Sequence, residues 1–373
     1  NSGQTAVFVP NGNLIDFNGV CQQPGPFIIT LQEENSNSFL SYQGKLYRGK
    51  LEVSLDKNGS LIVVNELPIE DYLCGVLPQE MLAWFPEEAL KAQAVASRTY
   101  TYSNLNKHKN NNYNLCATTH CQVYGGAGVE DSRTNNAVYS TRGEVLTYNG
   151  TLISAFYHAS SGGHTENSEN VWSAALPYLK GVVDYDQAFP RYNWVRILTP
   201  EQIEEGLKKS NLDVGTVKKV EPWGGFGVSG RPIFIKVTGS KGSIEIKSNN
   251  FRTIFDLPST LFVIEQSSSG YNVEKTRLDR TNKVTVINGN EQKKTIDLNG
   301  SYLVSGNDII TKLTSDPIVL NYQQSAAQIK FVGQGWGHGV GMSQWGAYGL
   351  AEKGYNYEQI LKHYYQGVNI ETW

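Results

Sequence analysis

The carboxyl group in this sequence that is best suited to acid–base chemistry is that of Glu80. It lies in a short connection between two predicted helices. Its neighbours are largely apolar: Leu77, Met81, Leu82, Trp84 and Phe85. An apolar environment disfavours the charged form, so it raises the pKa of a carboxyl group and lets it keep a proton near neutral pH. Such a group can give its proton to a leaving oxygen. The local pattern also fits a glutamate that caps a helix or forms an ion pair.

Soft metal ligands are grouped further along the chain. Cys116 and Cys121 lie five residues apart, with His108 upstream and His120 between them. Zinc binds thiolate and imidazole groups in a tetrahedral set. We expect Cys116, Cys121 and His108 to be the ligands, with His120 as the alternative third ligand. A disulfide between the two cysteines, which is common outside the cytoplasm, and two free thiols are the other interpretations.

Two glycine-rich segments, 160–165 and 335–344, have neither helical nor strand periodicity. Glycine lets a backbone approach a ligand closely, and the polar and aromatic side chains here suit sugar hydroxyls and sugar faces. The candidate substrate-binding residues are Ser160, Ser161, His164, Trp336, His338, Ser343 and Gln344. The alternative is a pair of tight structural turns with buried tryptophans.

The elements that must position these residues are predicted from periodicity and turn residues. Residues 1–66 indicate β structure, with a hairpin that turns at Asn58-Gly59. Apolar residues at helical spacing predict a helix from Pro68 that Pro78 ends. A second, alanine-rich helix is expected to start at Pro86.

Later elements include a hairpin over residues 144–160, another over 233–246, and a final helix over 357–364 that Gly367 caps. Glu70 and its acidic neighbours are assigned to helix starts and surface, and Arg98 is expected to pair with an acid in the core or to hold a tyrosine.

The predicted fold class is α+β, with helices packed on antiparallel hairpins. We expect four segments: an N-terminal β-rich part of the core over 1–66, a first core block over 67–184, a β-rich insertion or second domain over 185–330 that flanks a groove, and a second core block over 331–373.

The composition of the chain argues against nucleic-acid binding and against a membrane-spanning segment. The chain has 373 residues, a formal net charge of -3 and a pI near 6.1, with no long basic run, so nucleic acid is not an expected partner. No apolar stretch approaches the length needed to cross a bilayer. The first residues, from Asn1, have no initiator methionine, so we expect that a signal or membrane anchor has been removed.

Five ordered motifs resemble those of the stage II sporulation protein D family. They cover residues 67–81, 85–100, 118–124, 160–166 and 335–347. The sequence differs from the more common family pattern at Gln79, where Ser is frequent, and at Leu82, where Pro is frequent.

The resemblance implies a lytic transglycosylase of peptidoglycan with Glu80 as its catalytic residue. Such an enzyme cuts the MurNAc-GlcNAc β-1,4 bond of peptide-stripped strands and leaves 1,6-anhydro-MurNAc ends. The resemblance also implies an extracytoplasmic location, a role in engulfment during sporulation, an amidase and membrane-anchored proteins as partners, and zinc near Cys116.

Two other functions remain open at this point. Related proteins include amidase enhancers, which would bind the wall without cutting it. A zinc hydrolase acting on an amide is disfavoured because no His-Glu-x-x-His motif is present.

Overall fold

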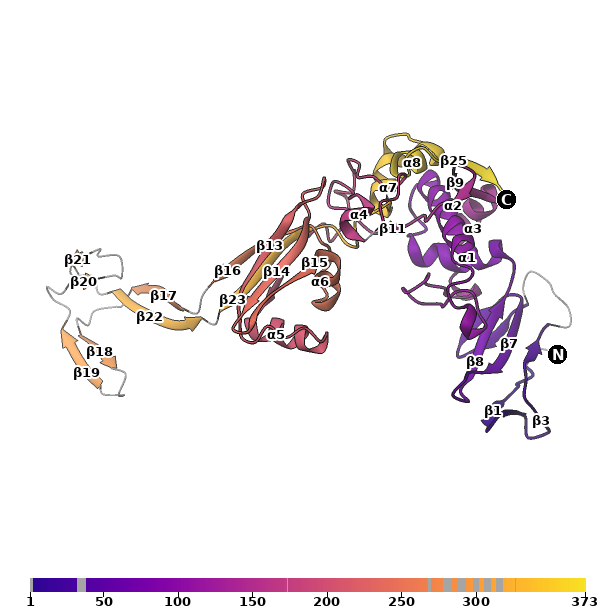
Figure 1. The fold of residues 1–373 in the computed structure, drawn as a ribbon, viewed down its shortest axis with the longest axis horizontal. Coiled ribbons are helices and arrows are strands. Elements are labelled where there is room, and N and C mark those ends of the chain that lie inside the picture. Colours follow the sequence, from indigo (N-terminus) through magenta and orange to yellow (C-terminus); the bar gives the residue numbers. More distant parts are fainter. Residues whose placement is uncertain are drawn as a thin grey trace.

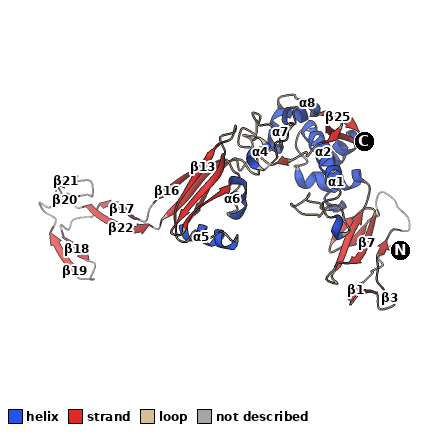
Figure 2. Ribbon diagram, viewed as in Figure 1, coloured by secondary structure: helices blue, strands red, loops and turns tan. Residues whose placement is uncertain are grey.

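The computed structural model describes residues 3–31, 38–172, 174–267 and 327–373, together with the backbone of several strands between 270 and 325. Helices and small, mostly antiparallel sheets alternate along the chain, which confirms the predicted α+β class (Figure 2). No helix among the described residues is long and apolar enough to cross a membrane.

The described residues of the N-terminal part form strands and no helix. The strands are β1 (Phe8–Asn11), β2 (Leu14–Phe17), β3 (Cys21–Gln23), β4 (Phe27–Ile29), β5 (Leu40–Tyr42), β6 (Lys45–Tyr47), β7 (Lys50–Leu55) and β8 (Leu61–Glu66). The predicted hairpin is confirmed as β7–β8, which pair in antiparallel register from Lys50↔Glu66 to Leu55↔Leu61. Gly59 has a φ of 77°, as the tight turn requires.

A helical core follows, close to β7 and β8 (Figure 1). Its helices are α1 (Ile69–Glu80), α2 (Glu87–Ser103), α3 (Ser132–Ser140), α4 (Ser168–Val171), α7 (Gln344–Glu352) and α8 (Tyr357–Tyr364). Short strands join them: β9 (Glu144–Tyr148), β10 (Thr151–Leu152), β11 (Tyr157–His158), β24 (Met342–Ser343) and β25 (Asn369–Thr372). The short 3-10 helices η1 (Lys109–Asn111) and η2 (Ala127–Val129) lie between α2 and α3.

One hydrophobic core unites the two ends of this helical part. It contains residues from Leu73 to Leu179 and again from Val340 to Val368. The parallel pairing of β11 with β24, in which Tyr157 lies beside Met342, joins the two blocks directly. The C-terminal motif therefore completes the core that the first motifs begin.

A second hydrophobic core lies between residues 194 and 331. It is built from β12 (Asn193–Leu198), α5 (Pro200–Lys209), β13 (Val217–Phe226), β14 (Pro232–Gly239), β15 (Gly242–Lys247), α6 (Ser248–Ile254), β16 (Phe262–Ser267) and β23 (Gln328–Gln334). The hairpin predicted over 233–246 is confirmed as β14–β15. In Figure 1 this unit lies beside α4 and the C-terminal helices.

The remaining strands extend beyond the second unit (Figure 1). They are β17 (Gly270–Arg277), β18 (Lys283–Ile287), β19 (Lys293–Asp297), β20 (Tyr302–Val304), β21 (Ile310–Lys312) and β22 (Ile318–Ser325), paired as β17–β22, β18–β19 and β20–β21.

Three predictions of element boundaries were wrong. Pro78 does not end the first helix, because α1 continues through it to Glu80 and Met81 donates its backbone N–H to Leu77 O at 2.9 Å. Burial of the helix in the core outweighs the hydrogen bond that proline cannot make. The hairpin over 144–160 pairs only as far as Leu152, since residues 157–158 pair instead with β24. The helix α8 was predicted correctly, but its C-cap is Tyr365 rather than Gly367.

Candidate active site

Glu80 is the last residue of α1, and not part of a connection as predicted. Burial raises the pKa of its carboxyl group above the ordinary value. The position at the C-terminal end of a helix acts in the same direction, because the partial negative charge there disfavours a carboxylate. The raised pKa that we predicted from the apolar neighbours of Glu80 in the sequence is confirmed.

Three hydrogen-bond donors act in the opposite direction and favour the charged form of Glu80. The Val123 backbone, the Gln344 amide and the Tyr157 hydroxyl each lower the pKa of Glu80, although burial outweighs them. The Gln344 Nε2 atom lies 3.4 Å from Glu80 Oε2. The acid therefore has partners for its charged form as well as an environment that favours its neutral form.

The orientation of Tyr157 follows from Gln122, which is fully buried. Gln122 Nε2 donates to the Ser97 carbonyl at 3.2 Å, and a carbonyl can only accept. The second Nε2 proton points to the Tyr157 oxygen at 3.1 Å. Since Tyr157 accepts from Gln122, its own proton is free to be donated to Glu80.

The other end of the same amide is also occupied. Gln122 Oε1 accepts from Thr101 Oγ1 at 2.8 Å and from the Tyr72 hydroxyl at 3.3 Å. Thr101 Oγ1 also lies 2.9 Å from the Ser97 carbonyl, so its one proton is shared between the two acceptors. A chain of polar groups runs from Tyr72 through Gln122 and Tyr157 to the acid.

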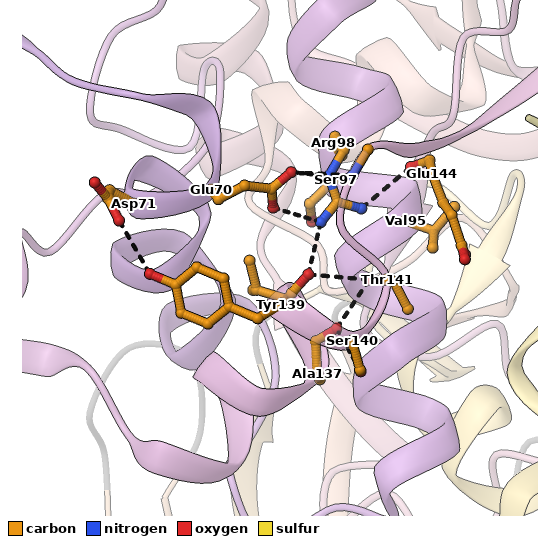
Figure 3. Close-up of polar contacts among 12 residues, drawn as sticks. Glu70, Asp71, Val95, Ser97, Arg98, Ala137, Tyr139, Ser140, Thr141 and Glu144 are labelled. Atoms are coloured by element: carbon orange, nitrogen blue, oxygen red, sulfur yellow. Dashed lines mark hydrogen bonds and ion pairs between the residues drawn. The ribbon is translucent and has the colours of Figure 1, made fainter. Parts of the chain in front are cut away.

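A buried ion pair fixes α1 against α2 (Figure 3). Arg98, which is 0% exposed, donates to both Glu70 carboxylate oxygens at 3.0 and 2.7 Å. It also donates to the carbonyls of Glu144 and Val138. Arg98 thus pairs with an acid in the core, one of the two expected roles, whereas the prediction that Glu70 is a capping or surface residue was wrong.

The serines of the two glycine-rich segments are buried. Ser160 and Ser161 are 0% exposed and donate their hydroxyls to Asp186 and Asp184 respectively. Ser343 is equally buried, and its hydroxyl accepts from Gly346 N at the start of α7. In this structure the three side chains hold the segments together and face no open surface.

The glycines of these segments allow the same close packing. A Cβ atom on Gly335, whose φ is 78°, would lie 2.7 Å from Ser160 O and from Gly162 N. The two backbones are joined here by Ser160 N–Trp336 O and Trp336 N–Ser160 O hydrogen bonds. The close approach that was expected towards a ligand is made in this structure between the two segments.

Two histidines of the predicted set make backbone contacts. His338 donates from Nε2 to Tyr157 O at 3.1 Å and accepts at Nδ1 from Val340 N at 3.1 Å. Burial lowers the pKa of His338 to about 3, so the ring is neutral and holds the backbone of Tyr157. His164 is half-buried, and its Nδ1 atom donates to Thr165 O at 2.6 Å.

Aromatic rings extend from the acid across the surface. Trp345, next to Gln344, contacts Trp84 and Phe189 at centroid distances of 5.9 and 5.8 Å. Phe189 continues to Trp336 at 6.4 Å. Trp84 is 52% exposed and Trp336 39% exposed, so both present ring surface to solvent. We call Trp84, Trp345, Phe189 and Trp336 the aromatic strip.

The predicted metal ligands come together. One ligand atom from each of His108, Cys116, His120 and Cys121 lies within 4.8 Å of the others. Both histidines belong to the cluster, although they were predicted as alternatives, and both cysteines are free thiols. Two sulfur and two nitrogen atoms match the tetrahedral set that zinc prefers, so the cluster could hold a metal ion.

The sequence did not single out several residues of this site. Val123 and Tyr157 donate to Glu80, Gln122 orients Tyr157, and Asp184 and Asp186 organise the two segments. Gln122 and Val123 lie inside one of the quoted motifs, which was the available signal. Asp184 and Asp186 lie 18 and 20 residues after the end of the segment 160–166, and two acids two residues apart have no helical or metal-binding pattern.

Comparisons with known proteins agree with this arrangement. A family model described as stage II sporulation protein matches residues 57–148, which include Glu80, Arg98 and the His/Cys cluster. A second model, a domain of unknown function, matches residues 179–281.

Relatives extend the likeness over most of the chain. An uncharacterized protein of Brachyspira hyodysenteriae is 32% identical over 99% of this chain and 83% of its own length. The amidase enhancer of Bacillus subtilis is 32% identical over 81% of this chain, which spans 40% of that protein. Stage II sporulation protein D of Bacillus subtilis is 29% identical over 82% of this chain and 75% of its own length.

The matched family model and the named relatives define the class as a sporulation-related protein. The chain belongs to the stage II sporulation protein D family.

Proposed function

We propose that this protein is a peptidoglycan lytic transglycosylase that uses Glu80 as both acid and base. The observation that carries the proposal is the environment of Glu80: burial raises its pKa, while donors from three separate segments are in place for its carboxylate. A group used twice in one reaction needs both forms to be accessible.

The proposed reaction balances without water. Protonated Glu80 gives its proton to the GlcNAc O4 atom as the bond from MurNAc C1 to O4 breaks. The acetamido group of the substrate stabilises the positive charge at C1. The MurNAc O6 atom then bonds to C1, and its proton returns to the Glu80 carboxylate, which leaves a 1,6-anhydro ring.

A single carboxyl group is consistent with this reaction. Glycosidases that use water as the final acceptor need a pair of carboxyl groups at defined separation. Among the described residues, no other carboxylate is among the groups that shift the pKa of Glu80. Transfer within the substrate needs no second carboxyl group, whereas hydrolysis would need one.

The hydrogen-bond donors around Glu80 stabilise its carboxylate between the two steps of the proposed reaction. Once Glu80 has lost its proton, the Tyr157 hydroxyl and the Gln344 amide stabilise the negative charge in a partly dry site. The position of the Tyr157 hydroxyl does not change with the charge, because Gln122 and His338 hold Tyr157 from its side chain and its backbone.

We propose that the aromatic strip holds the glycan along the expected groove. Pyranose rings present apolar faces that pack on exposed indole rings, and Trp336 and Trp84 offer such surfaces. Of the predicted substrate-binding set, Trp336 and Gln344 are the residues best placed for direct contact. We assign Ser160, Ser161, Ser343, His164 and His338 to holding the segments that carry them.

We further propose that the cluster of His108, Cys116, His120 and Cys121 holds zinc. Four protein ligands leave no open position for a water or a substrate, which is typical of structural zinc. Cys121 directly precedes Gln122, which donates to Tyr157, and Val123, whose backbone donates to Glu80. A zinc ion would thus stabilise the segment that supports the acid.

Family membership supports a role in cell-wall remodelling during sporulation, outside the cytoplasm. We propose glycan strands of peptidoglycan as the substrate, and an amidase and membrane-anchored sporulation proteins as partners.

A non-catalytic function is the second candidate. The named amidase enhancer is 32% identical to this chain over 312 residues. In that role the protein would bind the wall through the same strip and stimulate a partner without cutting glycan.

The reaction class is tested by digestion of amidase-stripped peptidoglycan in water enriched in 18O, followed by mass spectrometry. The proposal predicts anhydro-MurNAc ends without 18O. Reducing ends that carry 18O would identify a hydrolase, and glycan binding without any cut would identify the enhancer. Release of stem peptides from intact peptidoglycan would identify an amide hydrolase.

A further inference from the structure

A cavity of about 460 Å³ lies between the N-terminal strands and the helical core. Its walls come from β5, β6 and β8 on one side, and from α1, the end of α2 and residues 113–117 on the other. The volume falls in the range of small-ligand sites. The cavity lies apart from the aromatic strip, and the proposed reaction does not use it.

The lining is aromatic and hydroxylated. Tyr42, Tyr47, Tyr72, Tyr102, Tyr113 and Tyr124 all contribute to it. Tyr72 and Tyr124 donate their hydroxyls within the protein. In the described part of the chain, the hydroxyls of Tyr42, Tyr47 and Tyr113 have no hydrogen-bond partner. Ring faces with free hydroxyls beside them match the mixed apolar and polar surface of a pyranose ring.

Few charged side chains line the cavity. Glu66 at its edge is paired with Lys50 at 2.9 Å. Lys45 is the one cation of the lining, and it forms no ion pair among the described residues. The cavity therefore suits a neutral ring or a ring with one carboxylate. An N-acetylmuramic acid unit without its stem peptide carries one carboxylate on its lactyl group.

The cavity and the proposed acid share one helix. Tyr72 and Glu80 are eight residues apart on α1, which corresponds to about 12 Å along the helix axis. Tyr72 lines the cavity, and it is also the first member of the chain that runs through Gln122 and Tyr157 to Glu80. A saccharide in the cavity would thus lie close to a strand held at Glu80.

From these observations we propose that the tyrosine-lined cavity is a distal subsite for an amino-sugar unit of the same glycan strand. The inference rests on the proposed function for the identity of the strand. It assigns the N-terminal strands a direct part in substrate binding, with Tyr42, Tyr47 and Tyr113 as the ring-binding residues and Lys45 as the partner of a lactyl carboxylate.

The test measures binding separately from cutting. All proteins carry Glu80→Gln, and calorimetry gives the affinity for stripped glycan fragments, a tetrasaccharide and an octasaccharide. Tyr42→Ala removes a wall of the cavity, and Leu105→Trp fills it from a half-exposed lining position. Tyr355→Ala, an exposed tyrosine between α7 and α8, is the matched control.

The subsite predicts that the octasaccharide binds more tightly than the tetrasaccharide, and that both cavity variants weaken octasaccharide binding roughly tenfold. The control variant should bind as tightly as its parent. Equal affinity in all four proteins, or no glycan binding by the parent, would overturn the subsite. If the unmodified enzyme proves unable to cut glycan but the cavity variants still lose affinity, the proposed reaction fails and the subsite stands.

Discussion

At the scale of single residues, the chemistry depends on how the charge of Glu80 is balanced. Its apolar neighbours in sequence were sufficient to predict a raised pKa. The contacts that oppose it could not be predicted, because Val123, Tyr157 and Gln344 lie 43 to 264 positions away and only the fold brings them to the acid. Neither the position of Tyr157 nor the direction of its hydroxyl has a signal in the local sequence.

Replacing Tyr157 with Phe tests this balance. Loss of a donor to the carboxylate should raise the pKa of Glu80 further. The alkaline limb of the kcat/KM profile, where the acid loses its proton, should therefore move to higher pH. The rate below that limb should fall roughly tenfold, since a hydrogen bond to a charged group is lost. An unchanged limb in the pH–rate profile would show that Tyr157 does not act on Glu80.

At the scale of elements, α1 carries the acid and α2 anchors it. The helical pattern and the alanine-rich composition predicted both helices. The end of α1 was placed wrongly, because a proline is locally unfavourable in a helix but tertiary burial overrides it. Glu70 looked like an ordinary acid of a first helical turn, and its partner Arg98 is 28 residues away.

Loss of the ion pair between Arg98 and Glu70 should lower the stability of the fold strongly. Arg98→Ala leaves the Glu70 carboxylate buried without its partner, so the free energy of unfolding should fall by about 3–5 kcal/mol. The double variant Glu70→Leu, Arg98→Met removes both charges and should recover most of this loss. Urea denaturation measures both variants, with the exposed Arg133→Ala as control. A loss below about 1 kcal/mol in Arg98→Ala would contradict the role of the pair.

The residue types and the spacing around Cys116 and Cys121 were visible in the sequence and predicted a cluster that could hold a metal ion. The sequence left one histidine as an alternative because the loop conformation decides which rings meet. The structure brings both rings to the cluster.

Zinc at this cluster predicts a metal dependence. Elemental analysis should find roughly one zinc per chain, and Cys116→Ser should lose most of it. A chelator should lower the melting temperature and the rate of glycan cutting, because Gln122 and Val123 follow the cluster directly. Cys21→Ser is the control, as Cys21 is exposed and distant in sequence. The same zinc content in the parent and Cys116→Ser would refute the assignment.

At the scale of the whole molecule, the second unit is held to the helical core by reciprocal contacts. Glu166 of the core accepts from the backbone of Val228 and Ser229, and Arg231 of the second unit donates to the carbonyls of Ser161 and His164. The change in composition after about residue 185 led us to expect a β-rich insertion or second domain over 185–330. The contacts that attach it could not be predicted, since they use backbone groups that no side-chain pattern reveals.

Glu166→Gln tests this attachment. The neutral amide should weaken hydrogen bonds that now involve a charge, so the free energy of unfolding should fall by about 1.5–3 kcal/mol. Hydrogen exchange of residues 227–231 should become faster. Glu169→Gln, a nearby acid paired with Lys180 on the surface, should change neither quantity. Equal exchange in both variants would show that Glu166 does not hold the second unit.

The central claim is that Glu80 performs the cut. The most direct measurement is the rate at which anhydro-MurNAc ends form from stripped glycan with the parent, Glu80→Gln, and Glu88→Gln as a control acid at the start of α2. The account predicts a roughly 10²–10⁴-fold loss in Glu80→Gln, with glycan binding retained, and little change in Glu88→Gln. Anhydro ends that form at the parental rate in Glu80→Gln would contradict it.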